Sequence, residues 1–243
     1  MICRVFARLA LLAVVSTAAA CSAESDAASD GDGETVTAAA SRSPEYELWA
    51  KVVRDAGSPL HRNGRATVVG LRGTSLDGER HAVSSFRAYD DLLVVLRADG
   101  TVLRLPLSTH PFERKGVSGV PDVDGDGSRD VGMIRPGLYE ATGRGDGRFI
   151  AGHAAFDVRV AASGPRLLPG FRDTNHDGVF DEIERAASVA RSDVLSAVLF
   201  HTGDGSAPPA VGCQVLPAGA MDDFVRAVGG SNATFDYVLV DTE

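Results

Sequence analysis

A histidine and a cysteine lie near each other toward the carboxyl end of the chain. His201 and Cys213 are both found in the stretch FHTGDGSAPPAVGCQVLP, residues 200–217. The thiolate is the nucleophilic form of cysteine, a nearby imidazole can accept its proton, and backbone amides can stabilise an oxyanion. Gly212, directly before the cysteine, lets the backbone approach a substrate closely. These residue types are compatible with cysteine acyl transfer and also with a cysteine that only fills the core.

The cysteine count makes Cys213 unusual. The chain contains three cysteines. Cys3 lies in an N-terminal signal, and Cys21 is the expected site of lipid attachment, so Cys213 has no disulfide partner. An unpaired thiol outside the cytoplasm is exposed to oxidation, and its presence indicates either burial or reactivity.

A second group of residues has the spacing of a calcium-binding loop. Residues 173–184, DTNHDGVFDEIE, place oxygen atoms at positions 1, 3, 5, 7, 9 and 12 of a twelve-residue loop, with Gly178 at position 6. The expected ligands are Asp173, Asn175, Asp177, the carbonyl of Val179, Asp181 and Glu184. The pattern predicts a structural calcium site, and the alternative is a solvated Asp/Asn-Gly turn between strands.

A related acidic stretch precedes this loop in the chain. DVDGDGSRD, residues 122–130, begins with the same alternation of aspartates. Its twelfth position is Met133, which has no side-chain oxygen to offer a cation. We therefore expect a flexible acidic turn here in preference to a calcium site.

The chain begins with the features of an export signal. Residues 1–21, MICRVFARLALLAVVSTAAAC, contain two arginines, an apolar run and small residues before Cys21. The end of this segment resembles a bacterial lipobox, which predicts cleavage before Cys21 and diacylation of its thiol, a stable membrane anchor. Secretion after an Ala-x-Ala site and an uncleaved anchor are the alternatives.

The remaining chain divides into a tether and a domain. Residues 22–43 have no aromatic residue and are rich in Ser, Ala, Asp and Gly, so we expect them to be disordered. Residues 44–243 suffice for one domain with a sizeable core. The net charge of −9 and the absence of a Lys/Arg cluster exclude a typical nucleic-acid-binding protein.

The elements that must position these residues are mostly strands. We expect strands in RATVVGLRG, in the hairpin DLLVVLRADGTVLRLPLS, in GRFIAGHAAFDVRVAA, in SDVLSAVLF and in FDYVLVD. Helices are expected in SPEYELWAKVVRDAG, in EIERAASVAR and in AMDDFVRAVGG. Because RLLPGFR contains Pro169 and Gly170, no helix is expected before the calcium-type loop. Many strands with few short helices favour a mainly β or α+β fold.

Several of these segments together resemble a known enzyme family. FHTG, VGCQVLP, MDDFVRAV and FDYVLVD are similar to the catalytic core of the L,D-transpeptidase (YkuD-type) family, in particular to a branch with a GCQV signature. YDDLLVVL, STHP, RPGLYEATGR and FRDTNHDG follow the order of that branch, so the resemblance covers residues 60–243. It implies a β-rich, L,D-transpeptidase-like domain in the cell envelope.

The resemblance also implies roles for individual residues. Cys213 would attack a carbonyl of a peptidoglycan stem peptide and form a thioester, His201 would act as the base, and Gly212 would shape the oxyanion site. The acyl group would pass to an amine or to water. His153 matches a recurrent histidine of the branch and is a candidate cleft residue, with a structural hydrogen-bonding role as the alternative.

Two positions depart from the family pattern. Where the family has Ser or Thr and a second histidine, this chain has Ala210 and Val211, and its His-to-Cys spacing is shorter than usual. A hydroxyl and one hydrogen-bonding ring are therefore absent. The alternative function is an inactive, calcium-binding lipoprotein that uses the same fold as a binding module, anchored to a membrane and facing the periplasm or the exterior.

Overall fold

The computed structural model of the chain describes residues 42–83, 89–112, 119–145, 150, 152–160, 166–203 and 212–242. The expected signal segment, the lipidation site Cys21 and nearly all of the tether lie outside the described residues, as do Ala210 and Val211. The described residues belong to one compact unit, Ser41–Glu243. Among them, no helix is long and apolar enough to span a membrane.

The described part of the chain consists mainly of strands, which confirms the expected mainly β or α+β class. The helices are α1 (Pro44–Asp55), the 3-10 turn η1 (Arg62–Gly64), α2 (Glu182–Arg191) and α3 (Ala218–Val228). The strands are β1 (Thr67–Arg72), β2 (Asp91–Leu96), β3 (Val102–Leu107), β4 (Gly132–Ile134), β5 (Gly137–Gly143), β6 (Phe156–Val160), β7 (Leu168–Arg172), β8 (Val194–Leu195), β9 (Leu199–Gly203), β10 (Gln214–Pro217) and β11 (Thr234–Asp241).

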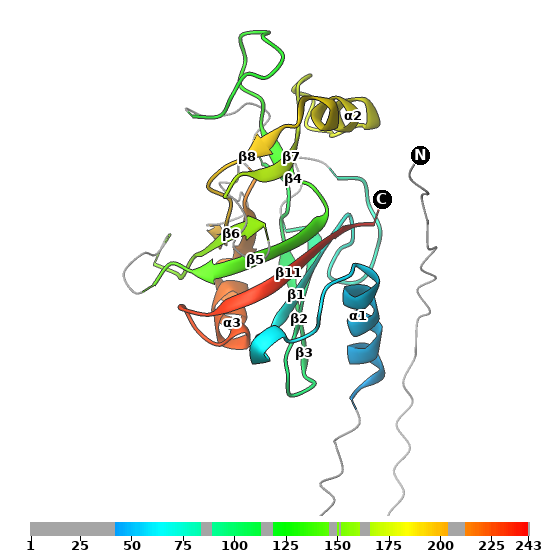
Figure 1. The fold of residues 1–243 in the computed structure, drawn as a ribbon, viewed down its shortest axis with the longest axis vertical. Coiled ribbons are helices and arrows are strands. Elements are labelled where there is room, and N and C mark those ends of the chain that lie inside the picture. The colour runs from blue at the N-terminus through cyan, green and yellow to red at the C-terminus, as the bar shows by residue number, and fades with distance from the viewer. Residues whose placement is uncertain are drawn as a thin grey trace, which may run out of the picture. The chain divides into compact units, whose positions relative to one another are not determined.

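The strands form two sheets (Figure 1). The large sheet has the order β10-β9-β6-β5-β11-β1-β2-β3, with β1 parallel to β11, β9 parallel to β10 and the other pairs antiparallel. Its two ends meet, because Ser108 and Val215 exchange backbone hydrogen bonds of 2.8 and 2.9 Å. The small sheet has the order β4-β7-β8 and lies beside α2.

Both faces of the large sheet are covered, so every residue of β2 is buried. On one face Leu93 and Val95 join a cluster that includes Phe224 of α3. On the other face Val94 packs in a cluster with Trp49 of α1. Burying a side chain of this size stabilises the fold by about 1.5–3 kcal/mol, so two helices suffice to fix the sheet.

Local capping and turn chemistry explain the elements that the sequence predicted best. The side chain of Ser43 accepts a hydrogen bond from Tyr46 N at 3.1 Å and caps α1. Asp99 Oδ1 accepts a hydrogen bond from Thr101 N at 2.9 Å, and Gly100 has φ of +86°, which gives the turn between β2 and β3.

The segment SDVLSAVLF differs from the expected single strand. It forms β8 and β9, with Ala197 between them at φ +55°. The break has a physical reason, because β8 pairs with β7 in the small sheet whereas β9 pairs with β6 and β10 in the large one. The chain therefore changes sheets just before the strand that carries His201.

Candidate active site around Cys213

The pairing of β9 with β10 brings the segment that contains Cys213 beside the strand that carries His201. The two strands are parallel, and Val215 lies opposite His201. Cys213 stands directly before β10, whose first residue, Gln214, pairs with Phe200 of β9. The strand pairing therefore explains how residues twelve positions apart in the chain come to lie on neighbouring segments.

His201 has the form of a neutral base. Its ring is 4% exposed, and its Nδ1 lies 2.7 Å from the carbonyl oxygen of Thr202. A carbonyl can only accept, so Nδ1 carries the proton and Nε2 keeps its lone pair. Burial lowers the pKa of His201 below its usual 6.5, although the Thr202 carbonyl opposes this. The imidazole is therefore neutral at pH 7 and able to accept a proton at Nε2.

Cys213 is a neutral thiol in this arrangement. The residue is partly exposed, and its Sγ lies 4.0 Å from the carbonyl oxygen of Ala197. Desolvation raises the pKa of the thiol to about 11, against the lowering effect of the Leu199 backbone. Among the described residues, Sγ is not hydrogen-bonded to the His201 ring. Both side chains are therefore neutral near pH 7.

Gly212 sits where no other residue fits. Its φ is +121°, and a Cβ there would lie 2.6 Å from the carbonyl oxygen of Gly132 and 2.5 Å from Leu195 Cδ2. Gly132 belongs to β4 and Leu195 to β8. Gly212, the residue before Cys213, thus packs directly against the small sheet, with no room for a side chain.

Replacing Gly212 with alanine should therefore destabilise the protein. We expect a loss of about 2–4 kcal/mol in the free energy of unfolding, from backbone strain at positive φ and from the clash with Gly132. Denaturant titration measures this change. The matched control is Gly219→Ala in α3, where a Cβ meets no atom within 4 Å. Equal stability of Gly212→Ala and the wild type would contradict the packing described here.

His153 contacts a helix. Its Nδ1 lies 2.9 Å from Asp222 Oδ1 of α3, and its backbone forms a bridge with Ile150. Among the described residues, no contact joins His153 to His201 or Cys213. These contacts match the alternative role of His153 as a structural hydrogen-bonding residue. Its role as a cleft residue stays a prediction.

Gln214 is a supporting residue that sequence reasoning missed. Its Oε1 accepts a hydrogen bond from the Tyr237 hydroxyl at 2.7 Å, on the core side of β10. Gly70 makes this possible, because a Cβ there would lie 2.4 Å from the Tyr237 hydroxyl oxygen. The hydrogen bond joins Gln214, the residue after Cys213, to Tyr237 of β11, which packs against Gly70 of β1.

A buried cluster of histidine and aspartate surrounds Thr109 and His110, directly after Ser108. The carboxylate of Asp91 accepts hydrogen bonds from Gly73 N, Thr109 N and Thr109 Oγ1 at 2.7 to 2.9 Å. His110 Nε2 lies 3.0 Å from Asp90 Oδ1. These residues lie next to Ser108, which bridges to Val215. The spacing of these residues along the chain does not indicate the cluster, because the pairing of distant strands brings them together.

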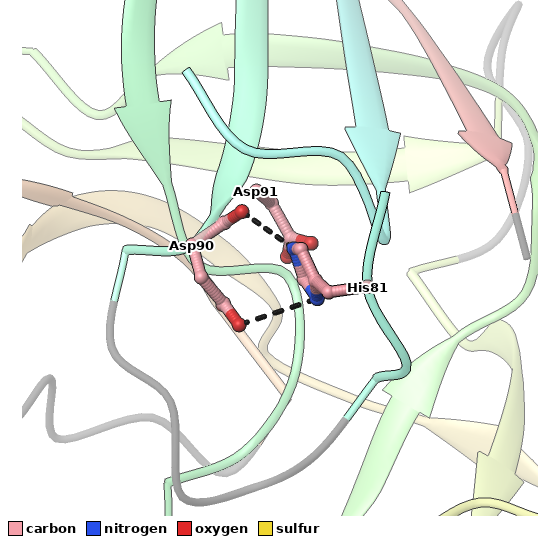
Figure 2. Close-up of side chains that lie close together, drawn as sticks. All are labelled: His81, Asp90 and Asp91. Atoms are coloured by element: carbon pink, nitrogen blue, oxygen red, sulfur yellow. Dashed lines mark hydrogen bonds and ion pairs between the residues drawn. The ribbon is translucent and has the colours of Figure 1, made fainter. Parts of the chain in front are cut away.

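The cluster also includes His81, beside Asp90, and the surroundings of both His81 and His110 favour the protonated imidazolium form. Both ring nitrogens of His81 face carbonyl oxygens, those of Ala82 at 3.0 Å and Asp90 at 2.7 Å, and Figure 2 shows the ring beside the Asp90 carboxylate. Burial lowers the pKa of His81, but the two carbonyls and the charges of Asp90 and Asp91 outweigh it, so the net shift is upward. Burial likewise opposes a raised pKa at His110, where the bond to Asp90 and the charge of Asp91 prevail. The carbonyl and carboxylate oxygens around the two rings stabilise their imidazolium forms.

A pH dependence of stability follows from these raised pKa values. The stabilisation is complete below the unfolded value of 6.5 and is lost as the pH rises through the folded values above it. We expect the melting temperature to fall as the pH rises above about 6.5. The pKa of His201 is lowered, so its titration affects the stability only at lower pH values than these. The fall should be smaller in His110→Gln, and a flat or rising wild-type profile would contradict the assignment.

The calcium-type loop connects β7 to α2. Asp181 Oδ1 accepts a hydrogen bond from Glu184 N at 2.8 Å and caps α2. Asn175 Oδ1 accepts from Asp177 N at 2.8 Å, and Asp177 Oδ1 accepts from Val179 N at 2.7 Å. Strand β7 precedes the loop, as expected from the absence of an entering helix. The six expected ligands thus lie along one tight turn whose ends are Asp173 and Glu184.

The two acidic stretches lie side by side, which the sequence did not indicate. His176 Nε2 of the calcium-type loop lies 3.0 Å from Asp130 Oδ1, and its Nδ1 lies 3.7 Å from Asp126. Oxygens of Asp122, Asp124 and Asp130 lie within 4.8 Å of one another. Both carboxylate oxygens of Asp122 accept backbone hydrogen bonds, from Gly125 and Gly127. Residues 122–130 therefore form a turn closed largely by their own hydrogen bonds.

Comparison with known proteins gives little further information. No protein-family profile matches the chain, and no curated protein matches it. Among solved structures, a mutant of the helical cell shape determining protein Pgp2 from Campylobacter jejuni is similar, with 13% identity and a TM-score of 0.35. The match covers 82% of this chain and 55% of that chain, so this chain spans about half the length of Pgp2. A likeness this weak decides neither the family nor the activity.

Proposed function

We propose that this domain is a cysteine acyltransferase of the L,D-transpeptidase type that acts on peptidoglycan stem peptides in the cell envelope. The observation that supports the proposal is the pairing of β9 with β10, which brings the segment with Cys213 beside the strand that carries His201, a histidine whose Nε2 keeps its lone pair. The resemblance of residues 60–243 to that family supports the substrate class. A lipid anchor at Cys21 would hold the domain near its substrate.

The chemistry proposed for this pair has two stages. In the first, Sγ of Cys213 attacks a stem-peptide carbonyl while Nε2 of His201 takes the thiol proton. The tetrahedral intermediate collapses, the amine leaves with the proton from the imidazolium, and a thioester remains. In the second stage an amine or water attacks the thioester, His201 accepts its proton, and the thiol is restored. The backbone at Gly212 and Cys213 is the proposed site for the oxyanion.

The resting electrostatics determine when the thiolate forms. With the thiol pKa raised to about 11 and the imidazole pKa lowered below its usual 6.5, proton transfer before substrate binding is strongly disfavoured. Attack and proton transfer must therefore be coupled, and the oxyanion contacts must supply much of the stabilisation. Because the free enzyme then contains little thiolate, Cys213 should resist oxidation outside the cell.

An inactive binding module is the second candidate. It is favoured by the raised pKa of Cys213 and by Ala210 and Val211, which replace a hydroxyl and a ring that would assist catalysis. Incubation of the purified protein with muropeptides distinguishes the two functions. An acyltransferase shortens or exchanges the terminal part of the stem peptide, and chromatography with mass detection reveals the products. Muropeptides that are bound but chemically unchanged would overturn the enzyme proposal.

A further inference from the structure

Two buried carboxylates at the ends of the 173–184 loop each keep one oxygen unused. Asp173 is 0% exposed and Glu184 is 4% exposed. Asp173 Oδ2 accepts a hydrogen bond from Gly178 N at 3.0 Å. Glu184 Oε1 accepts from Thr174 N at 2.7 Å and from Asn175 N at 3.0 Å. Within the described part of the chain, Asp173 Oδ1 and Glu184 Oε2 are shielded from solvent and accept no hydrogen bond.

This arrangement is unfavourable unless a cation is present. A buried carboxylate oxygen without a partner loses its hydration and gains nothing in return. Strand β7 ends directly before Asp173, α2 carries Glu184 in its first turn, and the hydrogen bond from Thr174 N to Glu184 Oε1 joins the two ends of the loop. A divalent cation would satisfy both free oxygens and cancel their repulsion.

The donor set of the loop indicates which cation. All candidate donors are oxygens: the two carboxylates, the side chains of Asn175 and Asp177, and the carbonyl of Val179. Calcium accepts six to eight such oxygens in variable geometry, whereas magnesium requires a regular octahedron and sheds water reluctantly. A loop that supplies several oxygens from one short stretch, with water completing the shell, therefore suits calcium better than magnesium.

We propose that residues 173–184 bind one calcium ion, held by Asp173 Oδ1 and Glu184 Oε2 and completed by Asn175, Asp177 and Val179. This site is independent of the proposed acyl transfer. Its role is structural, because the loop continues β7 and because Phe180 is buried against Met133 and Phe171 of the small sheet. That sheet is the surface on which Gly212 rests, so the ion stabilises the support of the nucleophile.

Thermal melting with and without calcium tests the site without any activity assay. Single calcium sites of extracellular modules have Kd of roughly 10⁻⁴–10⁻³ M, so about 10 mM calcium is at least tenfold above Kd. At ten times Kd, the melting temperature of the wild type should exceed its value in EDTA by about 3–6 °C. Magnesium at the same concentration should give a smaller shift. Isothermal titration should report one calcium ion per chain.

Two variants locate the ion. Glu184→Gln keeps an oxygen acceptor for the Thr174 and Asn175 amides but removes the charge, and its calcium shift should disappear. Asp122→Asn in the neighbouring turn should keep the full shift. Each variant is compared with itself in calcium and EDTA, so a change in its intrinsic stability does not affect the result. An unresponsive wild type, or a shift that survives in Glu184→Gln, would overturn the proposal.

Discussion

Cys213→Ala is expected to abolish acyl transfer. Loss of the nucleophile removes the thioester route altogether, and such losses typically lower kcat by about 10⁴–10⁶-fold. The fold should survive, because Cys213 is partly exposed and alanine removes only the sulfur. The measurement is the initial rate of product formation from muropeptides, normalised to the fraction of folded protein from circular dichroism.

The control for this prediction is a substitution on the same face that leaves the thiol in place. Val215→Ala, two residues after Cys213 and opposite His201, shortens a buried side chain without touching the reacting atoms. It should cost stability and leave most of the turnover intact. Turnover that persists in Cys213→Ala at a rate near the wild type would mean that another group performs the reaction.

His201→Gln should lower turnover by about 10²–10⁴-fold, the usual contribution of a general base. Glutamine can donate and accept hydrogen bonds, but it cannot take the thiol proton. The structure further predicts that this variant alkylates at the same rate as the wild type. The resting thiol is neutral with a pKa of about 11, so His201 does not generate thiolate before substrate binds.

Iodoacetamide alkylation across a pH series separates this mechanism from a preformed ion pair. With a neutral resting pair, the rate for Cys213 should rise about tenfold per pH unit up to about pH 10 in both the wild type and His201→Gln. A thiolate–imidazolium pair would instead react at a constant rate near pH 7 and lose that reactivity in His201→Gln. That second pattern would contradict the resting state described here.

Elements with strong local signals were predictable from sequence. The hairpin of β2 and β3 has two β-branched and leucine-rich runs about an Asp-Gly turn, and the helix of residues 44–55 has Ser43 as its cap. Strand β5, in RPGLYEATGR, was not expected, because glycines and polar residues interrupt its apolar pattern. Pairing with β11 on one side and β6 on the other forms this strand, and neither partner is local.

In the candidate site too, some features could be predicted from the local sequence, whereas others depend on contacts between distant segments. His201 and Cys213 were identified by residue type and by resemblance, and the parallel pairing of β9 with β10 explains why their segments lie side by side. The contact of Gly212 with Gly132, the Gln214–Tyr237 hydrogen bond and the closeness of His176 to Asp130 all join distant segments. No spacing rule within one stretch of sequence could have indicated them.

The most direct test of the account is to trap the acyl-enzyme. Intact-protein mass spectrometry, after brief incubation of the purified protein with a peptidoglycan stem peptide and rapid acid quench, should detect one acyl adduct per chain. Peptide mapping should place it on Cys213, and the adduct should be absent from Cys213→Ala. A wild-type protein that stays unmodified while it binds the peptide, or an adduct that persists in Cys213→Ala, would contradict the assignment of Cys213 as the nucleophile.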